Sequence, residues 1–130
     1  MKPFDIELAK QGHPIQTRDG RPVRIICYDR KSHLGIYPII ALVPMKEDRE
    51  DIIYYTKKGI YSNTGKQTGL DLFMTTTKKE AWVNLYKNKS GGLTVGGYLY
   101  DSEQKAINGG WEEDYFTTAK IEWRELQQIN

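Results

Sequence analysis

The sequence predicts an α+β fold that consists mainly of antiparallel strands. Its longest apolar run, Ile36–Val43, is too short to span a bilayer and rich in β-branched residues, which predicts a buried strand inside a sheet. Shorter apolar runs alternate with turn signals, and this spacing predicts a small barrel-like or rolled sheet over about residues 14–74. The strand pattern restarts after the threonine-rich stretch Thr75–Glu80, and one short helix precedes the first strand.

The length of 130 residues is that of a single compact domain, or of two packed sub-modules at 1–74 and 81–125. The hydrophobic fraction of 38% and the charged fraction of 28% are ordinary for a folded globular protein and exclude a disordered chain. The first residues lack the apolar stretch of an export signal, and the chain has one cysteine, so we expect a cytoplasmic protein without disulfides.

The N-terminal helix is predicted where Asp5 caps a short stretch that contains Ile6, Leu8 and Ala9. A helix this short is unstable alone in water, so we expect it to dock on the sheet. The dipeptide Asp19-Gly20 lies between two extended segments. This pair predicts a two-residue hairpin turn with a positive φ at the glycine.

The strand after this turn is predicted to run from about Arg21 to Tyr28. Its alternation places one set of side chains toward the core, namely Val23, Ile25 and Cys27, and turns another set outward, namely Arg24, Ile26 and Tyr28. Cys27 is therefore expected to be a small buried hydrophobe rather than a nucleophile. Two further strands are predicted over Asp51–Thr56 and Leu70–Met74, and the second closes the rolled sheet.

After the linker, the pattern predicts a β-β-α-β segment. Its first strand contains Trp82–Tyr86, and its second strand, Leu93–Tyr100, contains two adjacent glycines that indicate a bulge. Ser102–Asn108 is predicted to be a helix, because Asp101 and Gln104 have the spacing of the cap and third residue of a capping box. Tyr115–Glu125 is the last predicted strand, and we expect the two segments to pack against each other.

Side chains with catalytic or metal-binding potential are few. The two histidines, His13 and His33, lie in predicted loops, and their spacing to Cys27 is not that of a zinc site. Gly65-Lys66-Gln67-Thr68 is similar to the end of a phosphate-binding loop, but Ile60 stands where such a loop has its first glycine. We therefore expect a plain turn at Gly65–Thr68. For the chain as a whole we expect no catalytic residue, no metal ion and no cofactor.

The net charge of +2 is unevenly distributed. Residues 1–80 carry 14 Lys and Arg against 10 Asp and Glu, whereas residues 81–130 carry 5 against 7. Nine tyrosines and three tryptophans exceed the needs of a core of this size, and tyrosine with arginine is typical of binding surfaces. The alternative explanation is that strands favour tyrosine and hairpin ends favour charge. The candidate binding surface consists of Arg18, Arg21, Arg24, Tyr28, Tyr54, Lys57, Lys58 and Tyr61.

Four stretches carry a resemblance to a known family: the Arg18–Arg21 turn followed by Val23–Asp29, the strand Tyr37–Val43, the stretch Leu70–Met74, and Trp82–Tyr86. With them the chain resembles a family of short uncharacterised proteins that occur in gut Bacteroidetes and in phages and mobile elements. The resemblance spans most of the chain. It implies a phage or mobile-element context, and it implies no activity, ligand or catalytic residue.

Three function classes are compatible with these observations. The first is a small non-enzymatic binding or accessory protein that acts through its sheet surface on a protein partner. The second is a nucleic-acid-binding module that uses the basic N-terminal segment, with weak and salt-sensitive binding because acids are interspersed with the cations. The third, a small enzyme, ranks last because the sequence shows no nucleophile with a base. No membrane partner is expected, and a homo-oligomer is compatible with each class.

Overall fold

The computed structural model describes residues 1–31, 33–62 and 64–129. The chain divides into two compact units, each built around a sheet. The N-terminal unit comprises Met1–Thr77 together with the residues from Leu126 onward, and the C-terminal unit comprises Lys78–Glu125. In the described part of the chain, no helix is long and apolar enough to cross a membrane.

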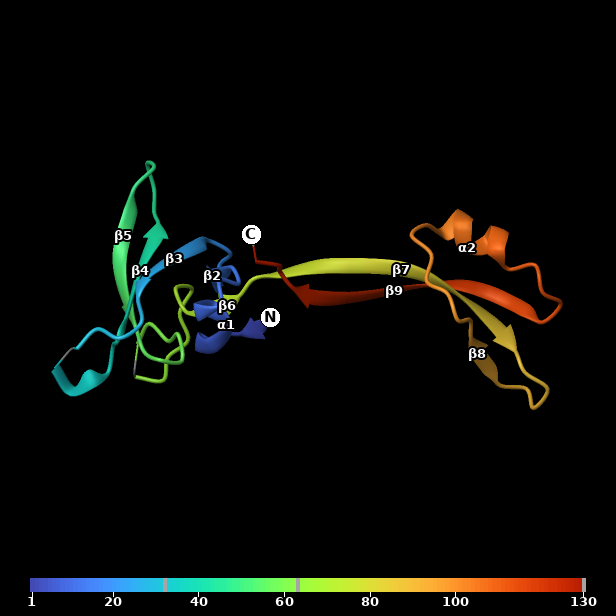
Figure 1. Ribbon diagram of the computed structural model, residues 1–130, viewed down its shortest axis with the longest axis horizontal. Coiled ribbons are helices and arrows are strands. Elements are labelled where there is room, and N and C mark those ends of the chain that lie inside the picture. The colour runs from blue at the N-terminus through green and yellow to red at the C-terminus, as the bar shows by residue number, and fades with distance from the viewer. Residues whose placement is uncertain (32, 63, 130) are drawn as a thin grey trace. The chain divides into compact units, whose positions relative to one another are not determined.

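The N-terminal unit contains a six-stranded sheet in which each neighbouring pair of strands is antiparallel. Its strand order is β1 (Lys2–Pro3), β6 (Leu72–Met74), β2 (Ile15–Thr17), β3 (Pro22–Cys27), β4 (Ile39–Pro44) and β5 (Glu50–Tyr55). Figure 1 labels strands β2 to β6 of this sheet. The predicted antiparallel, β-rich fold is confirmed. The predicted barrel-like closure is wrong, because β6 inserts between β1 and β2 and, among the described residues, nothing joins β1 to β5.

Strand β4 lies between β3 and β5, and a short 3-10 turn, η1 (His33–Gly35), precedes it. Ile39, Ala41 and Val43 are completely buried, as predicted, but the strand lies next to the edge strand β5 and not in the middle of the sheet. The alternate residues of β4 are only partly covered. The strand begins at Ile39 rather than Ile36, because Pro38 lacks the backbone N–H that a ladder position needs.

Helix α1 (Ile6–Lys10) forms at the predicted place. The Asp5 carboxylate accepts hydrogen bonds from the backbone N–H groups of Glu7 and Leu8 at 2.9 and 3.2 Å, which caps the helix. Ala9 is buried in a cluster with Ile15 and Met74. The short helix therefore docks on β2 and β6, as its length requires.

The hairpin between β2 and β3 contains a loop of three residues rather than the predicted two. The backbone N–H of Thr17 donates to the Arg21 carbonyl at 2.9 Å, and the Arg21 N–H donates to the Thr17 hydroxyl at 3.0 Å. These bonds close the loop one residue earlier than the Asp-Gly pair alone predicts. Gly20 has a φ of 90°, which confirms the predicted left-handed conformation.

A β-bulge lies in β3 at Ile26. Ile25 pairs with Ala41, but Cys27 pairs with Ile40, so Ile26 is an extra residue opposite β4. The extra residue reverses the alternation, which turns Cys27 to the outward side and brings Tyr28 onto the core. The predicted faces are therefore wrong for Cys27 and Tyr28, whereas Ile26 is exposed as predicted.

The core of the N-terminal unit is a cluster of buried side chains from four strands, Val23, Ile39, Ala41, Val43, Tyr55 and Leu72. Tyr55 is completely buried, and its hydroxyl donates to the Leu70 carbonyl at 2.8 Å. Gly59 packs against the Phe4 ring so closely that a Cβ atom there would lie 2.8 Å from a ring carbon. The chain after β5 is thus held in place at Gly59 and at Leu70.

The C-terminal unit contains the sheet β8-β7-β9, with β7 (Thr76–Lys87) in the middle (Figure 1). β8 (Leu93–Val95) ends before Gly96, earlier than predicted. The Gly96 N–H still donates to the Asn84 carbonyl of β7 at 2.8 Å, and an isolated bridge pairs Trp82 of β7 with Tyr100. Helix α2 (Glu103–Gly109) and β9 (Tyr115–Leu126) complete the unit. Ser102 caps α2 in place of the predicted Asp101, because its hydroxyl accepts the Lys105 N–H at 3.2 Å.

Asn84 is the buried polar residue at the centre of the C-terminal unit. Its side-chain nitrogen donates to the Ala106 carbonyl of α2 at 2.7 Å, and its oxygen accepts from the Thr118 hydroxyl of β9 at 2.7 Å. Since Asn84 lies on β7, one side chain links α2 to both long strands. Buried polar groups need such partners, because an unpaired one costs free energy.

Candidate functional site

The structure distributes the eight predicted surface residues over the N-terminal unit. Three of them, Arg18, Lys57 and Lys58, line one cavity, whereas Tyr54 and Tyr61 line another. Arg21, Arg24 and Tyr28 belong to neither cavity. The single candidate surface of the sequence analysis therefore resolves into separate sites with different chemistry.

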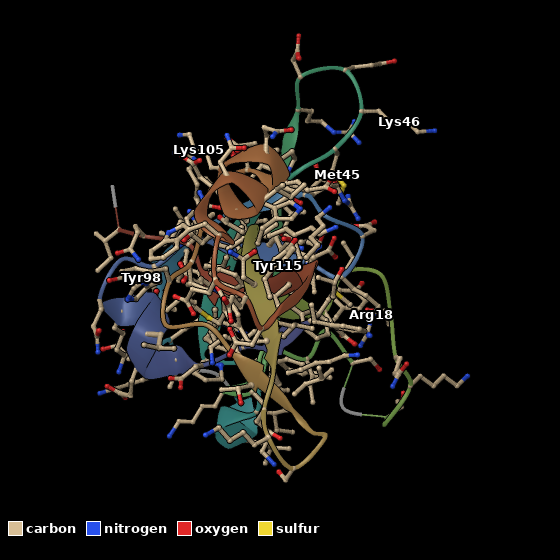
Figure 2. The ribbon with its side chains drawn as sticks, turned by 90° about the vertical axis from the view of Figure 1, so that its right-hand side faces the viewer. Arg18, Met45, Lys46, Tyr98, Lys105 and Tyr115 are labelled. Atoms are coloured by element: carbon tan, nitrogen blue, oxygen red, sulfur yellow. The ribbon has the colours of Figure 1, made fainter. Side chains whose placement is uncertain are left out.

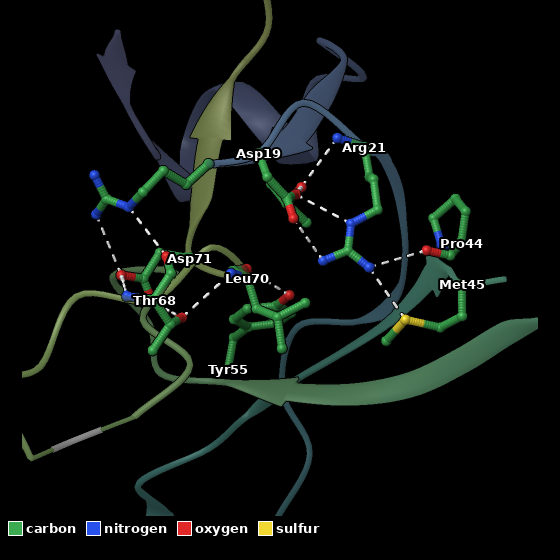
Figure 3. A network of polar contacts seen from close by, with 10 residues as sticks. Asp19, Arg21, Pro44, Met45, Tyr55, Thr68, Leu70 and Asp71 are labelled. Carbon is green, nitrogen blue, oxygen red and sulfur yellow. Dashed lines mark hydrogen bonds and ion pairs between the residues drawn. The ribbon is translucent and has the colours of Figure 1, made fainter.

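Arg21 is held by the hairpin (Figure 3). Its guanidinium donates to the Asp19 carboxylate at 2.9 and 3.0 Å and to the Pro44 carbonyl at 3.2 Å, and it lies 3.1 Å from the Met45 sulfur. Arg21 and the Thr17 hydroxyl lower the pKa of Asp19, and Asp19 raises the pKa of Arg21. The guanidinium thus joins the hairpin to the end of β4 and has little capacity for a ligand.

Arg24 and Tyr28 are also occupied by contacts within the unit. Arg24 pairs with Glu50 of β5, with nitrogen–oxygen distances of 2.6 and 3.3 Å, although both side chains are exposed. Tyr28 packs against the core clusters, with the Lys10 ammonium 5.8 Å from its ring centre, and burial raises its pKa. The Arg24 guanidinium is thus engaged by Glu50, and the Tyr28 ring is held against the core.

The outward side of β3, β4 and β5 presents apolar side chains, which we call the outer face. The register pairs Leu42 with Ile52 and Ile40 with Tyr54, and directly opposed residues lie on the same side of a sheet. Ile52 is 60% exposed, Tyr54 is 44% exposed, and Ile26 at the bulge is 59% exposed. The apolar residues of the outer face are Ile26, Ile40, Leu42, Ile52 and Tyr54, and the ion pair between Arg24, which is opposite Leu42, and Glu50 lies on the same side.

A hollow of about 390 Å³ opens next to β5, at the border of the outer face. Tyr37, Tyr54 and Tyr61 contribute to its lining. The Arg30 guanidinium lies 4.2 Å from the centre of the Tyr54 ring and donates to the Tyr37 carbonyl at 3.1 and 3.2 Å. These contacts hold the arginine and the aromatic ring together beside the edge strand.

A larger cavity of about 620 Å³, which we call the lysine cavity, lies in the same unit. Its positively charged lining comes from the turn after β5, from the loop before β6 and from Arg18 of the hairpin. The residues that define it are Arg18, Ile36, Lys57, Lys58, Ile60 and Lys66.

A tight turn positions Lys57 and Lys58. The backbone N–H groups of Thr56 and Gly59 bond to the carbonyls of Ile60 and Thr56 at 3.0 and 2.9 Å, and the Ile60 N–H donates to the Thr56 hydroxyl at 3.1 Å. The two lysines therefore lie at the end of a closed loop. Such a loop holds its charges at one place on the surface.

Asp71 organises the loop that carries Lys66 (Figure 3). Its carboxylate accepts from the Tyr61 N–H at 3.0 Å, from the Thr68 N–H and hydroxyl at 3.1 Å each, and from Arg18 at 3.3 Å. Burial opposes ionisation of Asp71, but the hydrogen bonds from Tyr61, Thr68 and Arg18 outweigh it and lower the pKa. The ionised carboxylate is a structural centre with all of its acceptor positions engaged.

The C-terminal unit has a smaller hollow of about 300 Å³. Its lining includes the acids Glu112 and Asp114, with Lys87 as the basic residue and Tyr98 as an exposed ring (Figure 2). The described lining is net acidic, in contrast to that of the lysine cavity. An anionic ligand is therefore favoured by the N-terminal unit and disfavoured here.

The described residues contain no group of three or more His, Cys, Asp and Glu side chains that could hold a metal ion. The His13 ring lies 3.1 Å from the Gln127 carbonyl, and the side chain of His33 lies outside the described residues. Cys27 lies on the outward side of β3, with its sulfur 3.4 Å from the Asp29 carboxylate, so the predicted burial in the core is wrong. Its position follows from the bulge at Ile26.

Sequence reasoning missed Arg30, Tyr37 and Lys66, which the structure brings to the two cavities. The Gly-Lys pair of the incomplete phosphate-binding pattern could have indicated Lys66 as a binding residue. No sequence pattern indicates Arg30, because its contact with Tyr54 joins a loop to a strand far along the chain.

Comparison with protein families finds one match, to the family described as Haemophilus phage HP1 protein YO09, over residues 1–80. The match covers the whole described β1–β6 sheet and the first residues of β7. No curated protein and no solved structure matches the chain.

Proposed function

Because the chain belongs to the family of Haemophilus phage HP1 protein YO09, we propose that it is a phage-associated, non-enzymatic binding protein whose partner is a protein. The partner contacts the outer face of the N-terminal unit, beside the edge of β5. One observation carries this proposal, the apolar outer face on a sheet that is otherwise well packed.

The two sides of the same strands support a binding role for the outer face. On the core side, Ile39, Val43 and Tyr55 are completely buried, whereas Ile52 on the outer face is 60% exposed. Outward positions of a half-covered antiparallel sheet are usually polar. An exposed set of apolar side chains at such positions is typical of a protein interface.

The free edge of β5 adds a second element to the interface. β5 ends the sheet, and the stretch Ile52–Tyr55 lacks the lysine or proline that commonly protects an edge strand. An extended segment of a partner can pair with such an edge and place its side chains in neighbouring hollows. The hollow beside Tyr54 and Tyr61 offers aromatic contacts of the kind that dominate binding energy.

Affinity capture from phage-infected host cells, followed by mass spectrometry, tests this proposal. The wild-type protein is compared with Ile52→Glu on the outer face and with Leu99→Glu, a matched control in the C-terminal unit whose leucine is 62% exposed. We expect one protein to be recovered with the wild type and the control, and recovery to fall about tenfold with Ile52→Glu, because a charge is then desolvated in the interface.

Both variants should keep the thermal unfolding midpoint of the wild type, since both positions are exposed. Equal recovery with Ile52→Glu and with the wild type would remove the outer face as the binding site. Recovery of an untagged copy of the same chain would identify the partner as a second copy.

Nucleic acid is the second candidate partner, and the lysine cavity is the observation that favours it. Arg21 and Arg24 are engaged by Asp19 and Glu50, so they have little charge to offer to phosphates. Lys57 and Lys58 form no ion pair with any described residue. Salt-dependent binding of a polyanion is therefore expected to depend on these lysines.

A further inference from the structure

The lysine cavity carries more positive charge than its surroundings neutralise. Lys57, Lys58 and Lys66 line it, and none of them forms an ion pair with a described residue. Asp71 is the one acid among the described lining residues, and its carboxylate is already engaged by Arg18 and by the loop. Three lysines of one concave site therefore have no ion-pair partner among the described residues.

The number of charges selects the kind of anion. A carboxylate brings a single negative charge, whereas a phosphate monoester brings about −1.5 to −2 at neutral pH and three acceptor oxygens. Lysine ammonium groups are compact donors that bind phosphate as point charges. Three lysines around one cavity thus match a phosphate group better than a carboxylate.

The size and the apolar walls of the cavity favour a ligand that has an organic part besides its phosphate. Its volume of about 620 Å³ lies within the roughly 300–1,000 Å³ of small-molecule sites, and Ile36 and Ile60 supply apolar walls. A second hollow of about 270 Å³ shares Arg18, Lys58 and Ile60 with it and is lined by the Phe73 ring. The Arg18 guanidinium lies 4.7 Å from the centre of that ring, which holds Arg18 beside both spaces.

We propose that the lysine cavity binds a nucleotide-sized ligand that carries a phosphate group. The phosphate contacts Lys57, Lys58 and Lys66, and the ring system lies against Ile36 and Ile60. This site is separate from the outer face, so the inference does not depend on the proposed protein partner. A free nucleotide and the phosphorylated end of a single-stranded nucleic acid share this chemistry.

Isothermal titration calorimetry of the full chain tests the site with three probes: deoxythymidine 5′-monophosphate, thymidine, and a 5′-phosphorylated oligothymidylate. We expect saturable binding of the monophosphate and none of thymidine, because the phosphate supplies the charge. Affinity should fall as salt rises from roughly 50 to 200 mM. The double variant Lys57→Ala with Lys58→Ala should weaken binding of the monophosphate about tenfold.

Lys46→Ala is the matched control, because Lys46 is an exposed lysine of the same unit outside the cavity (Figure 2). It should leave the affinity unchanged. Lys66→Ala, in the other loop of the cavity, should weaken binding in the same direction as the double variant. Unchanged thermal unfolding of all variants, whose lysines are exposed, shows that the losses do not come from unfolding.

The probes also distinguish the two sources of the ligand. Equal affinity for the monophosphate and the oligothymidylate identifies a free nucleotide as sufficient, and an affinity more than about tenfold higher for the oligothymidylate identifies a nucleic-acid end. Either result supports the proposal. Absence of binding of both phosphorylated probes overturns it, as does a loss with Lys46→Ala that equals the loss with the double variant.

Discussion

The two units of the chain bury their apolar side chains to very different extents. In the N-terminal unit, six residues from four strands form one buried cluster around Ile39 and Tyr55. In the described part of the C-terminal unit, the buried hydrophobic residues are Ala81, Val83 and Ala106, whereas large aromatic side chains are exposed. Hydrophobic burial therefore stabilises the first unit, and hydrogen bonds around Asn84 have a larger share in the second.

The family match follows the same division. It covers residues 1–80, which contain the six-stranded sheet, the outer face and the lysine cavity. The C-terminal unit, from Lys78 to Glu125, lies almost entirely beyond the match. The pattern that defines the family is thus the pattern of the well-packed unit, and both proposed sites lie within it.

Replacing Ile39 by alanine should have the largest effect on stability. Its side chain is completely buried, and the substitution leaves a cavity, so we expect a loss of about 2–5 kcal/mol in the free energy of unfolding. Urea unfolding followed by circular dichroism measures the loss. The matched variant Ile121→Ala, in β9 with a side chain 37% exposed, should lose clearly less. Equal losses would break the contrast between the units.

Asn84→Ala tests how much the hydrogen bonds of Asn84 stabilise the C-terminal unit. The substitution leaves the Ala106 carbonyl and the Thr118 hydroxyl without their buried partner, which should cost about 1–3 kcal/mol. Hydrogen exchange should accelerate in α2, while the amides of β4 keep their protection. Gln104→Ala, an exposed position on α2, is the control. Uniform acceleration in both units would show that they unfold as one.

The smallest expected effect is a pH dependence of the stability of the N-terminal unit. The pKa of Asp71 is lower in the folded state than in the unfolded chain, so the ionised carboxylate stabilises the fold. This contribution to the free energy of unfolding is fully present above the unfolded pKa of about 3.8, and it is lost as pH falls through the folded pKa. Asp71→Asn should lower stability at neutral pH and flatten the loss below pH 4. The exposed Asp48→Asn should retain the wild-type dependence. Thermal unfolding between about pH 2.5 and 7 measures both.

Local features of the fold could be predicted because neighbouring residues encode them. Asp5 caps α1, and Gly20 has the left-handed conformation that its turn requires. The β-branched run around Ile39 forms a strand with a completely buried face, next to the edge strand β5. Each of these depends on contacts within a few residues or on simple alternation.

The candidate sites were predictable only in part. Arg18, Lys57 and Lys58 were identified as basic surface residues, and the structure brings them to one cavity. Arg21 and Arg24 were identified for the same reason, but Asp19 and Glu50 engage them. Composition shows which residues carry charge, whereas the partner of each charge depends on which strands and loops meet.

The sequence by itself determined the antiparallel, β-rich character of the chain, the capped helix and the glycine turn. The tertiary structure alone decided the sheet order, in which β6 enters between β1 and β2, and the bulge that moves Cys27 outward and Tyr28 inward. It also decided that Lys66 joins Lys57 and Lys58. The reason is physical: alternation and capping are short-range, while strand pairing and charge pairing join residues that are distant along the chain.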